Sequence, residues 1–279
     1  MQRVLMFLVG FLTMLAWLPT PAVAAPEAQT PSCQFVLGFA TLHRLIPAIV
    51  GNCLANESHS GNGDGLQPTE HGLLVWRKAD NFTAFTDGFR TWVNGPFGIQ
   101  MRLNTQRFDF EKNAKVSMTQ AITFTPPTSA SRQVSGSCFT SSLAAIRKDA
   151  FRCMSDNAIM DPCFTIPGNA LAVICVPNPL DPSTFVQMNL TQPLPATEPV
   201  SPPSHPWFLE LADGTVCNFL TGATGAVNGQ RINYGCSDGL DVVGFPAPGT
   251  VQTVQEVRLA PLSTTVLKTF TVDVKTVWQ

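Results

Sequence analysis

The sequence predicts two structural parts: an α+β N-terminal module, made of a helix and a small antiparallel β ribbon, and a mainly-β, disulfide-containing domain of sandwich or barrel type. Apolar residues recur at helical spacing in residues 35–50. From about Lys115 onward they alternate with polar residues, and turn signals rich in Gly and Pro separate the runs. Eight cysteines add a disulfide framework. We therefore expect the module to span residues 33–111 and the β-rich domain to span residues 115–279.

Residues 1–25 have the pattern of a secretory signal peptide. Arg3 provides a positive charge, an apolar run spans Val4–Leu18, and Ala22-Val23-Ala24 is a small-x-small cleavage site. The alternative is a membrane anchor, but a run of about 15 residues is shorter than the roughly 20 that a spanning helix needs. We expect a secreted, extracytoplasmic protein that keeps no membrane anchor after the signal is removed.

All eight cysteines follow the signal, and an even number in an exported chain favours disulfides. Zinc is the alternative, but no two cysteines have the tight Cys-x-x-Cys spacing of a zinc site. Position suggests two pairs, because one flanks the expected helix and the other flanks a Gly-rich hairpin connection. The remaining four cysteines allow three connectivities, of which we favour one. The expected disulfides are Cys33–Cys53 around the helix, Cys217–Cys236 around the hairpin connection, and Cys153–Cys163 with Cys138–Cys175 among the remaining four.

The N-terminal module contains a helix and several short strands. The apolar stripe in residues 35–50 predicts a helix that Pro47 kinks or ends. Residues 55–71 are polar and Gly-rich and are expected to form a loop. Short β-prone runs follow, with a hairpin turn at Thr86-Asp87-Gly88, and a closing helix is expected over residues 99–108. The β-prone runs are 73–77, 82–85 and 89–93.

Period-two runs divide the β-rich domain into candidate strands. The last run alternates apolar and polar residues nearly throughout, as expected of a strand with one buried face. The Pro-rich segment 192–206 is either a long surface loop or a linker, and a linker would split the domain near Pro195. We favour a loop within a single domain, because neither half has an obviously complete set of strands. The candidate strands are 116–124, 143–151, 170–176, 184–190, 207–212, 215–219, 231–236, 251–259 and 265–277.

Residues 72–96, GLLVWRKADNFTAFTDGFRTWVNGP, form a specific motif. The motif resembles a module that recurs in exported bacterial proteins, where it is joined to different partner domains. The similarity extends upstream through Cys53 and Ile46-Pro47 into the expected helix, and downstream to Phe108. The second part of the chain, with motifs such as Asp161-Pro162-Cys163-Phe164 and Cys236-Ser237-Asp238-Gly239, is similar to a family of exported actinobacterial-type proteins. The resemblance implies export and a modular build, and it supplies no catalytic residues.

The aromatic ribbon within this motif is the strongest candidate binding site. Alternate residues of a strand share a face, so Arg90 and Trp92 are expected side by side. An indole can stack on the apolar face of a sugar while arginine and asparagine donate hydrogen bonds to the sugar hydroxyls. The alternative is that these rings form the core of the module. The candidate ligand-binding residues are Trp76, Arg77, Arg90, Trp92 and Asn94.

Composition and motifs favour a binding protein over an enzyme. A formal net charge of −2 argues against a nucleic-acid partner. The sequence has no Gly-x-Ser-x-Gly or His-Glu-x-x-His signature. The acids Asp213 and Asp238 could serve a glycoside hydrolase, but each precedes Gly in an expected turn.

We therefore expect a non-enzymatic cell-envelope or extracellular binding module whose partner is a cell-wall or extracellular polysaccharide. No metal and no cofactor are expected. One alternative function is that of a secreted hydrolase acting on envelope polymer. The other is that of a structural or protein-interaction protein.

Overall fold

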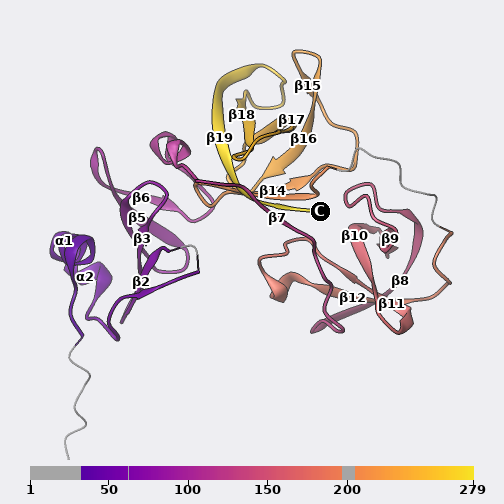
Figure 1. The fold of residues 1–279 in the computed structure, drawn as a ribbon, viewed down its shortest axis with the longest axis horizontal. Helices are drawn as coiled ribbons and strands as arrows, with labels where there is room; N and C mark the ends of the chain where they lie inside the picture. The colour runs from indigo at the N-terminus through magenta and orange to yellow at the C-terminus, as the bar shows by residue number, and fades with distance from the viewer. Residues whose placement is uncertain (1–32, 62, 197–204) are drawn as a thin grey trace, which may run out of the picture. The chain divides into compact units, whose positions relative to one another are not determined.

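The computed structural model is mainly β and contains closed barrels (Figure 1), which confirms the expected fold class in outline. It describes residues 33–61, 63–196 and 205–279. The expected signal peptide and the middle of the Pro-rich segment lie outside the described residues. None of the described helices has the length and apolar character that crossing a membrane requires.

Six antiparallel strands form the N-terminal sheet, in the order β1 to β6. They are β1 (Ser58–His59), β2 (Gly65–Thr69), β3 (Gly72–Arg77), β4 (Phe82–Thr86), β5 (Arg90–Gly95) and β6 (Gly98–Leu103). Helices α1 (Leu37–Leu45) and α2 (Pro47–Val50) pack on one face of the sheet, where Phe39 and Phe85 belong to one buried cluster (Figure 1). Pro47 begins α2, a position at which its missing N–H has no helical partner to lose. The predicted break in the helix is therefore confirmed.

Strand β6 shows that the helix expected over residues 99–108 is wrong. The turn between β5 and β6 ends at Gly98, whose φ of 82° suits glycine. The chain then returns antiparallel to β5, with Met101 opposite Trp92 and Ile99 opposite Asn94. Pairing with the neighbouring strand overrides the apolar spacing that suggested a helix, because local propensity is a weak constraint.

Strand β2 corrects the expectation that residues 55–71 form a loop throughout. Gln67 in this strand is fully buried, although its side chain is polar. Its amide nitrogen donates hydrogen bonds to the backbone oxygens of Gln34 and Ala55, at 2.9 and 3.0 Å. A polar run can therefore be interior when its side chains bond the backbone of neighbouring segments.

Five strands form a closed barrel, called the first barrel below. They are β8 (Arg132–Ser141), β9 (Ala150–Ser155), β10 (Ala158–Ile166), β11 (Asn169–Cys175) and β12 (Val186–Leu190), with the 3₁₀ helix η2 (Pro182–Thr184) before β12. Neighbouring strands are antiparallel except at the closure, where β12 pairs in parallel with β8. Closure removes the free sheet edges that an open sheet of this size would expose.

A second ring of strands, the C-terminal barrel, follows the Pro-rich segment. Its strands are β13 (Phe208–Leu211), β14 (Val216–Phe219), β16 (Gln230–Cys236), β17 (Asp241–Ala247), β18 (Thr253–Leu259) and β19 (Val266–Trp278). The ring closes because β13 pairs with both β14 and β19. The short strands β7 (Gln120–Ile122) and β15 (Ala226–Val227) pair with β19 and β16.

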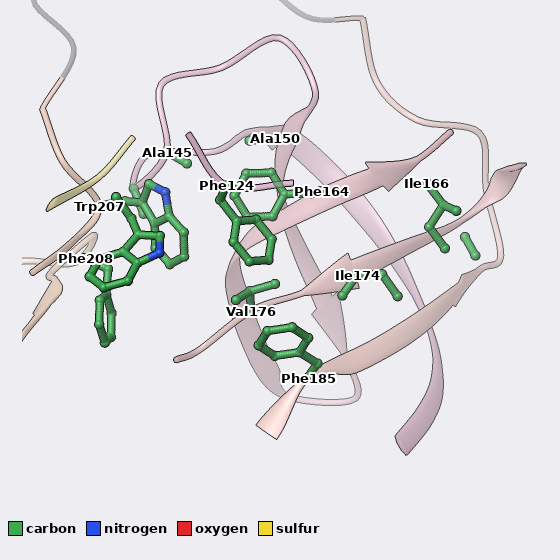
Figure 2. Close-up of a cluster of buried hydrophobic side chains, with 13 residues drawn as sticks. Phe124, Ala145, Ala150, Phe164, Ile166, Ile174, Val176, Phe185, Trp207 and Phe208 are labelled. Carbon is green, nitrogen blue, oxygen red and sulfur yellow. The ribbon is translucent and has the colours of Figure 1, made fainter. Parts of the chain in front are cut away.

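The strands before the Pro-rich segment and those after it thus form separate rings. From the sequence, neither half had an obviously complete set of strands. One hydrophobic cluster nevertheless draws residues from both barrels. Figure 2 shows its aromatic rings: Phe124 lies 5.1 Å from Phe164 of β10 and 5.8 Å from Trp207, measured between ring centroids. Phe208 and Trp278, at 5.3 Å, extend the same cluster into the C-terminal barrel. The two rings therefore share part of their core.

Two of the expected disulfides are present and two are wrong. The structure contains Cys33–Cys53, Cys217–Cys236, Cys138–Cys153 and Cys163–Cys175. The last two replace the expected Cys153–Cys163 and Cys138–Cys175. Strand register is the reason, because Met160 lies opposite Cys153 in the β9–β10 pair, while Cys163 lies opposite Phe151. Each barrel disulfide instead joins residues directly opposite each other on neighbouring strands.

A buried carboxylate lies beside the N-terminal sheet, on the 3₁₀ helix η1 (Asp109–Asn113). The side chain of Glu111 is fully buried and accepts hydrogen bonds from Arg77 at 2.8 Å and from Arg102 at 2.7 and 2.8 Å. Burial alone would raise the pKa of Glu111, but Arg102 and Arg77 outweigh it and lower this pKa below 4.5. Glu111 is therefore ionised and holds η1 to strands β3 and β6.

Replacing Phe164 with alanine should destabilise the shared core. The ring is fully buried, so we expect the free energy of unfolding to fall by roughly 3–5 kcal/mol. Denaturant unfolding of the purified protein measures this change. Leu171→Ala is the control, because Leu171 is 76% exposed and its loss should cost no more than about 0.5 kcal/mol. Equal effects of the two variants would contradict the assigned core.

Glu111→Gln should leave two arginines facing a neutral side chain, at a cost of roughly 3–5 kcal/mol near neutral pH. The folded pKa of Glu111 lies below 4.5, so its contribution is complete above pH 4.5 and is lost as the pH falls through the folded value. The stability difference between wild type and variant should therefore shrink below pH 4.5, as measured by urea unfolding across a pH series. Asp149→Asn, which alters a half-exposed pair with Arg147, should cost about 1 kcal/mol or less.

Candidate functional site

Four of the five expected ligand-binding residues lie on one face of the N-terminal sheet. Trp76 and Asn94 stand on either side of Thr83, because β4 pairs with both β3 and β5. Arg90 and Trp92 precede Asn94 at intervals of two along β5 and share its face. The expectation that Arg90 and Trp92 lie on one side is thus met, but this is also the face that α1 and α2 cover.

The other contacts of these side chains are structural. Trp92 is half-buried and packs 5.7 Å from Phe85, measured between ring centroids, at the edge of the helix-covered core. Arg77 lies on the opposite face, where its guanidinium pairs with Asp80 and Glu111. Arg77 and Trp92 are therefore engaged within the protein, while Trp76 remains beside an open groove.

A groove of about 520 Å³ lies between the start of α1 and strands β1, β3 and β4. The indole nitrogen of Trp76 donates a hydrogen bond of 2.8 Å to the side-chain oxygen of Asn81, which fixes the orientation of the ring. The groove is lined by Val36, Leu37, Gly38, Phe39, Glu57, His59, Trp76, Asn81 and Thr83. A concave site with an aromatic wall and a few placed polar groups is typical of a pocket for a small molecule.

The start of α1 is held close to β4 in an uncommon conformation. A Cβ atom on Gly38 would lie 2.3 Å from the hydroxyl oxygen of Thr83, so only glycine permits this approach. The preceding residue, Leu37, has a φ of 47° and is 87% exposed. A left-handed backbone at a leucine costs about 1–2 kcal/mol, and strain of this kind often marks a ligand site.

Polar side chains stand on the rim of the same groove. The carboxylate of Glu57 and the imidazole of His59 approach to 3.6 Å, and their side chains are 21% and 62% exposed. Asn81 and Thr83 add an amide and a hydroxyl on the other side. An apolar wall with hydrogen-bonding groups along its edge suits a ligand that has one apolar face and a polar perimeter.

Sequence reasoning identified only one member of this groove, Trp76. The aliphatic residues Val36 and Leu37 belong to the beginning of the expected helix, and Glu57 and His59 belong to the expected loop. Their short polar and apolar runs carry no pattern that distinguishes groove residues from ordinary surface. The antiparallel pairing of β1 with β2 and of β2 with β3 brings His59 beside Trp76.

A second cluster of chemically active groups surrounds Lys112, the residue after Glu111 in η1. Its Nζ atom lies 3.0 Å from an oxygen of Asp213, 2.5 Å from one of Asp238 and 2.6 Å from one of Glu256. All four side chains are at least 97% buried. Asp213 and Asp238 precede Gly214 and Gly239 in tight turns as predicted, yet both carboxylates point inward and not to solvent.

Asp213 and Glu256 in this cluster differ in the direction in which their pKa values are shifted. Burial would lower the pKa of Lys112, but Asp213, Glu256 and Asp238 raise it above 10.5. Burial would raise the pKa of Asp213, but Lys112 outweighs it and the pKa falls below 3.8. For Glu256 burial dominates and raises the pKa to about 7. The cluster therefore contains one firm ion pair and one acid that exchanges protons near neutrality.

The arrangement gives no support to glycoside cleavage by Asp213 and Asp238. A hydrolase needs space for a sugar and a water between its two acids. Here the Lys112 ammonium occupies the position that the two carboxylates share. Cys217 and Cys236 lie within 4.8 Å of the Glu256 carboxylate, but their sulfurs form a disulfide and cannot bind a metal as thiolates.

Comparison with known proteins gives no match: no protein-family model, no curated protein and no solved structure matches this chain. The resemblance of residues 72–96 to a module of exported bacterial proteins therefore stays a prediction. The groove beside Trp76 is therefore the feature that bears on function.

Proposed function

We propose that the protein is an extracytoplasmic, non-enzymatic binding protein whose groove beside Trp76 holds one sugar ring of a cell-wall or extracellular polysaccharide. The observation that carries this proposal is the fixed indole of Trp76 in a groove rimmed by Glu57 and His59. The sugar's C–H face stacks on the indole, and its hydroxyl groups exchange hydrogen bonds with the carboxylate and the imidazole.

The shape of the groove favours a chain end or a single projecting sugar over a long bound strand. Its volume of about 520 Å³ lies within the range of small-ligand sites. The strained and exposed Leu37 supplies an aliphatic contact at the rim, which a sugar ring would bury. The apolar burial on binding would thus offset part of the backbone strain at Leu37.

The proposed location rests on independent features of the chain. Residues 1–25 have the pattern of a secretory signal. Four disulfides in a chain of this length are typical of proteins that fold outside the reducing cytosol. We propose that residues 33–111 act as the α+β binding module and that the barrels of residues 115–279 carry it as a rigid, disulfide-bonded support.

Replacing Trp76 with alanine tests the proposal. Retention of the purified protein on insoluble peptidoglycan, chitin and cellulose is measured, and at least one of these should retain the wild type. Loss of the stacked indole removes roughly 1.5–3 kcal/mol of apolar contact, so the affinity should fall at least about tenfold.

Phe97→Ala is the matched control, because Phe97 is 77% exposed in the turn between β5 and β6 and lies outside the groove. It should bind like the wild type, and circular dichroism should show that both variants are folded. Equal retention of the Trp76→Ala variant, or no retention of the wild type on any of the three polymers, would refute the proposed site.

A further inference from the structure

The Lys112 cluster brings an amine and a carboxyl group together in a space from which water is excluded. Lys112 is 2% exposed, and the side chains of Asp213 and Glu256 are fully buried. The Cys217–Cys236 disulfide covers the cluster on the side of Glu256. Buried ion pairs are expensive because several kcal/mol of hydration is lost for each ion. A reaction that converts the pair into a neutral group is therefore favoured here more than in water.

The two oxygens of the Asp213 carboxyl group have different surroundings. One oxygen, Oδ1, accepts a hydrogen bond of 2.9 Å from the buried backbone N–H of Thr215. The other, Oδ2, lies 3.0 Å from Nζ of Lys112 and accepts no aligned hydrogen bond from the residues that the structure describes. A backbone N–H at one oxygen stabilises negative charge that develops there, while the second oxygen is free to leave.

Glu256 supplies the proton transfer that such a reaction needs. Its Oε2 atom lies 2.6 Å from Nζ, and neither of its oxygens has another hydrogen-bond partner in the described structure. Because its pKa is raised to about 7, this carboxyl group can take and return a proton near neutral pH. Glu256 thus differs from Asp238, whose Oδ2 accepts a direct hydrogen bond from Lys112 at 2.5 Å.

We propose that Lys112 and Asp213 form an intramolecular amide bond between their side chains, with Glu256 as the proton carrier. Glu256, as the carboxylate, first takes a proton from the Lys112 ammonium; Nζ then attacks Cγ of Asp213, so that the Nζ–Cγ bond forms and the Cγ–Oδ2 bond breaks. Of the three protons of the ammonium, one stays on the amide nitrogen and Glu256 relays two to Oδ2, which leaves as water. Glu256 ends in its starting state, nothing is oxidised or reduced, and no co-reactant is consumed.

Asp238 has a different role in this scheme. After the bond forms, the remaining N–H of the amide points to a carboxylate that Leu240 already fixes through a backbone hydrogen bond of 3.2 Å to Oδ1. The contact of 2.5 Å between Asp238 and Nζ then becomes a hydrogen bond from the amide nitrogen. Asp238 therefore orients the nitrogen, whereas Asp213 provides the carbon.

The consequence is a covalent link between η1 and the turn that joins β13 to β14. Such a link would close a loop in the chain that no reductant opens, in contrast to the four disulfides. The proposed amide bond does not depend on the proposed sugar site, since the groove and the Lys112 cluster share no residue.

The mass of the mature, fully reduced and denatured protein tests this inference directly. With the N-terminus determined by sequencing, the wild type should be lighter than its sequence by one water molecule. Trypsin should not cut after the acylated Lys112, and the digest should contain one cross-linked peptide that joins Lys112 to Asp213. A wild type with the full sequence mass overturns the proposal, and this result depends on no variant being able to fold.

Variants assign the individual roles. Asp213→Ala should restore the full mass, and Asp238→Asn should keep the loss of water. Glu256→Gln should restore the full mass in protein whose circular dichroism shows that it is folded. A cross-linked peptide that contains Asp238 in place of Asp213, or loss of water in the Glu256→Gln variant, would overturn the corresponding assignment.

Discussion

Glu111 and Lys112 are adjacent in the chain, carry opposite charges and are both almost completely removed from water. Their counter-charges come from different parts of the structure: Arg77 and Arg102 of the N-terminal sheet surround Glu111, and acids of the C-terminal barrel surround Lys112. A buried ion without its partners costs several kcal/mol. The 3₁₀ helix η1 can therefore occupy its place only when both sheets present these side chains, and it constrains the chain on either side.

Disulfides impose a comparable constraint within each barrel. Cys138–Cys153, Cys163–Cys175 and Cys217–Cys236 each join residues that lie opposite each other on neighbouring antiparallel strands. A slip of one residue in any of these pairs would turn one cysteine to the other face of the sheet. The disulfides thus fix the register of these three strand pairs.

The local parts of the fold could be predicted from the sequence. Pro47 ends a helix because it has no backbone N–H and its ring clashes with the preceding turn. The turn at residues 86–88 likewise depends on the residues within it. Features that depend on partners distant in the sequence could not be predicted. The cysteine pairing in the first barrel follows from register, the strand at Gly98–Leu103 follows from pairing with β5, and the closure of each ring has no local signal.

The candidate site divides in the same way. Trp76 was identified because it belongs to a specific motif and because an aromatic residue is informative by itself. Its neighbours Leu37, Glu57 and His59 are common residue types, and only folding brings them to the groove. Arg77 illustrates the converse: the sequence grouped it with Trp76, but the two residues are adjacent in β3 and face opposite sides of the sheet, and its partner Glu111 lies outside the motif.

Three acids surround one lysine in the Lys112 cluster, and the proposed amide bond accounts for this excess of acids. With Glu256 protonated, the ammonium of Lys112 and the carboxylate of Asp213 are a buried ion pair. An amide between Lys112 and Asp213 removes both of these buried ions and leaves the net charge unchanged, so the hydration penalty falls without a compensating charge from elsewhere. A second lysine would neutralise the cluster as a set of ion pairs and remove this driving force. An excess of acid over base is therefore what a site for amide formation requires, because one acid is consumed, one carries protons and one orients the nitrogen.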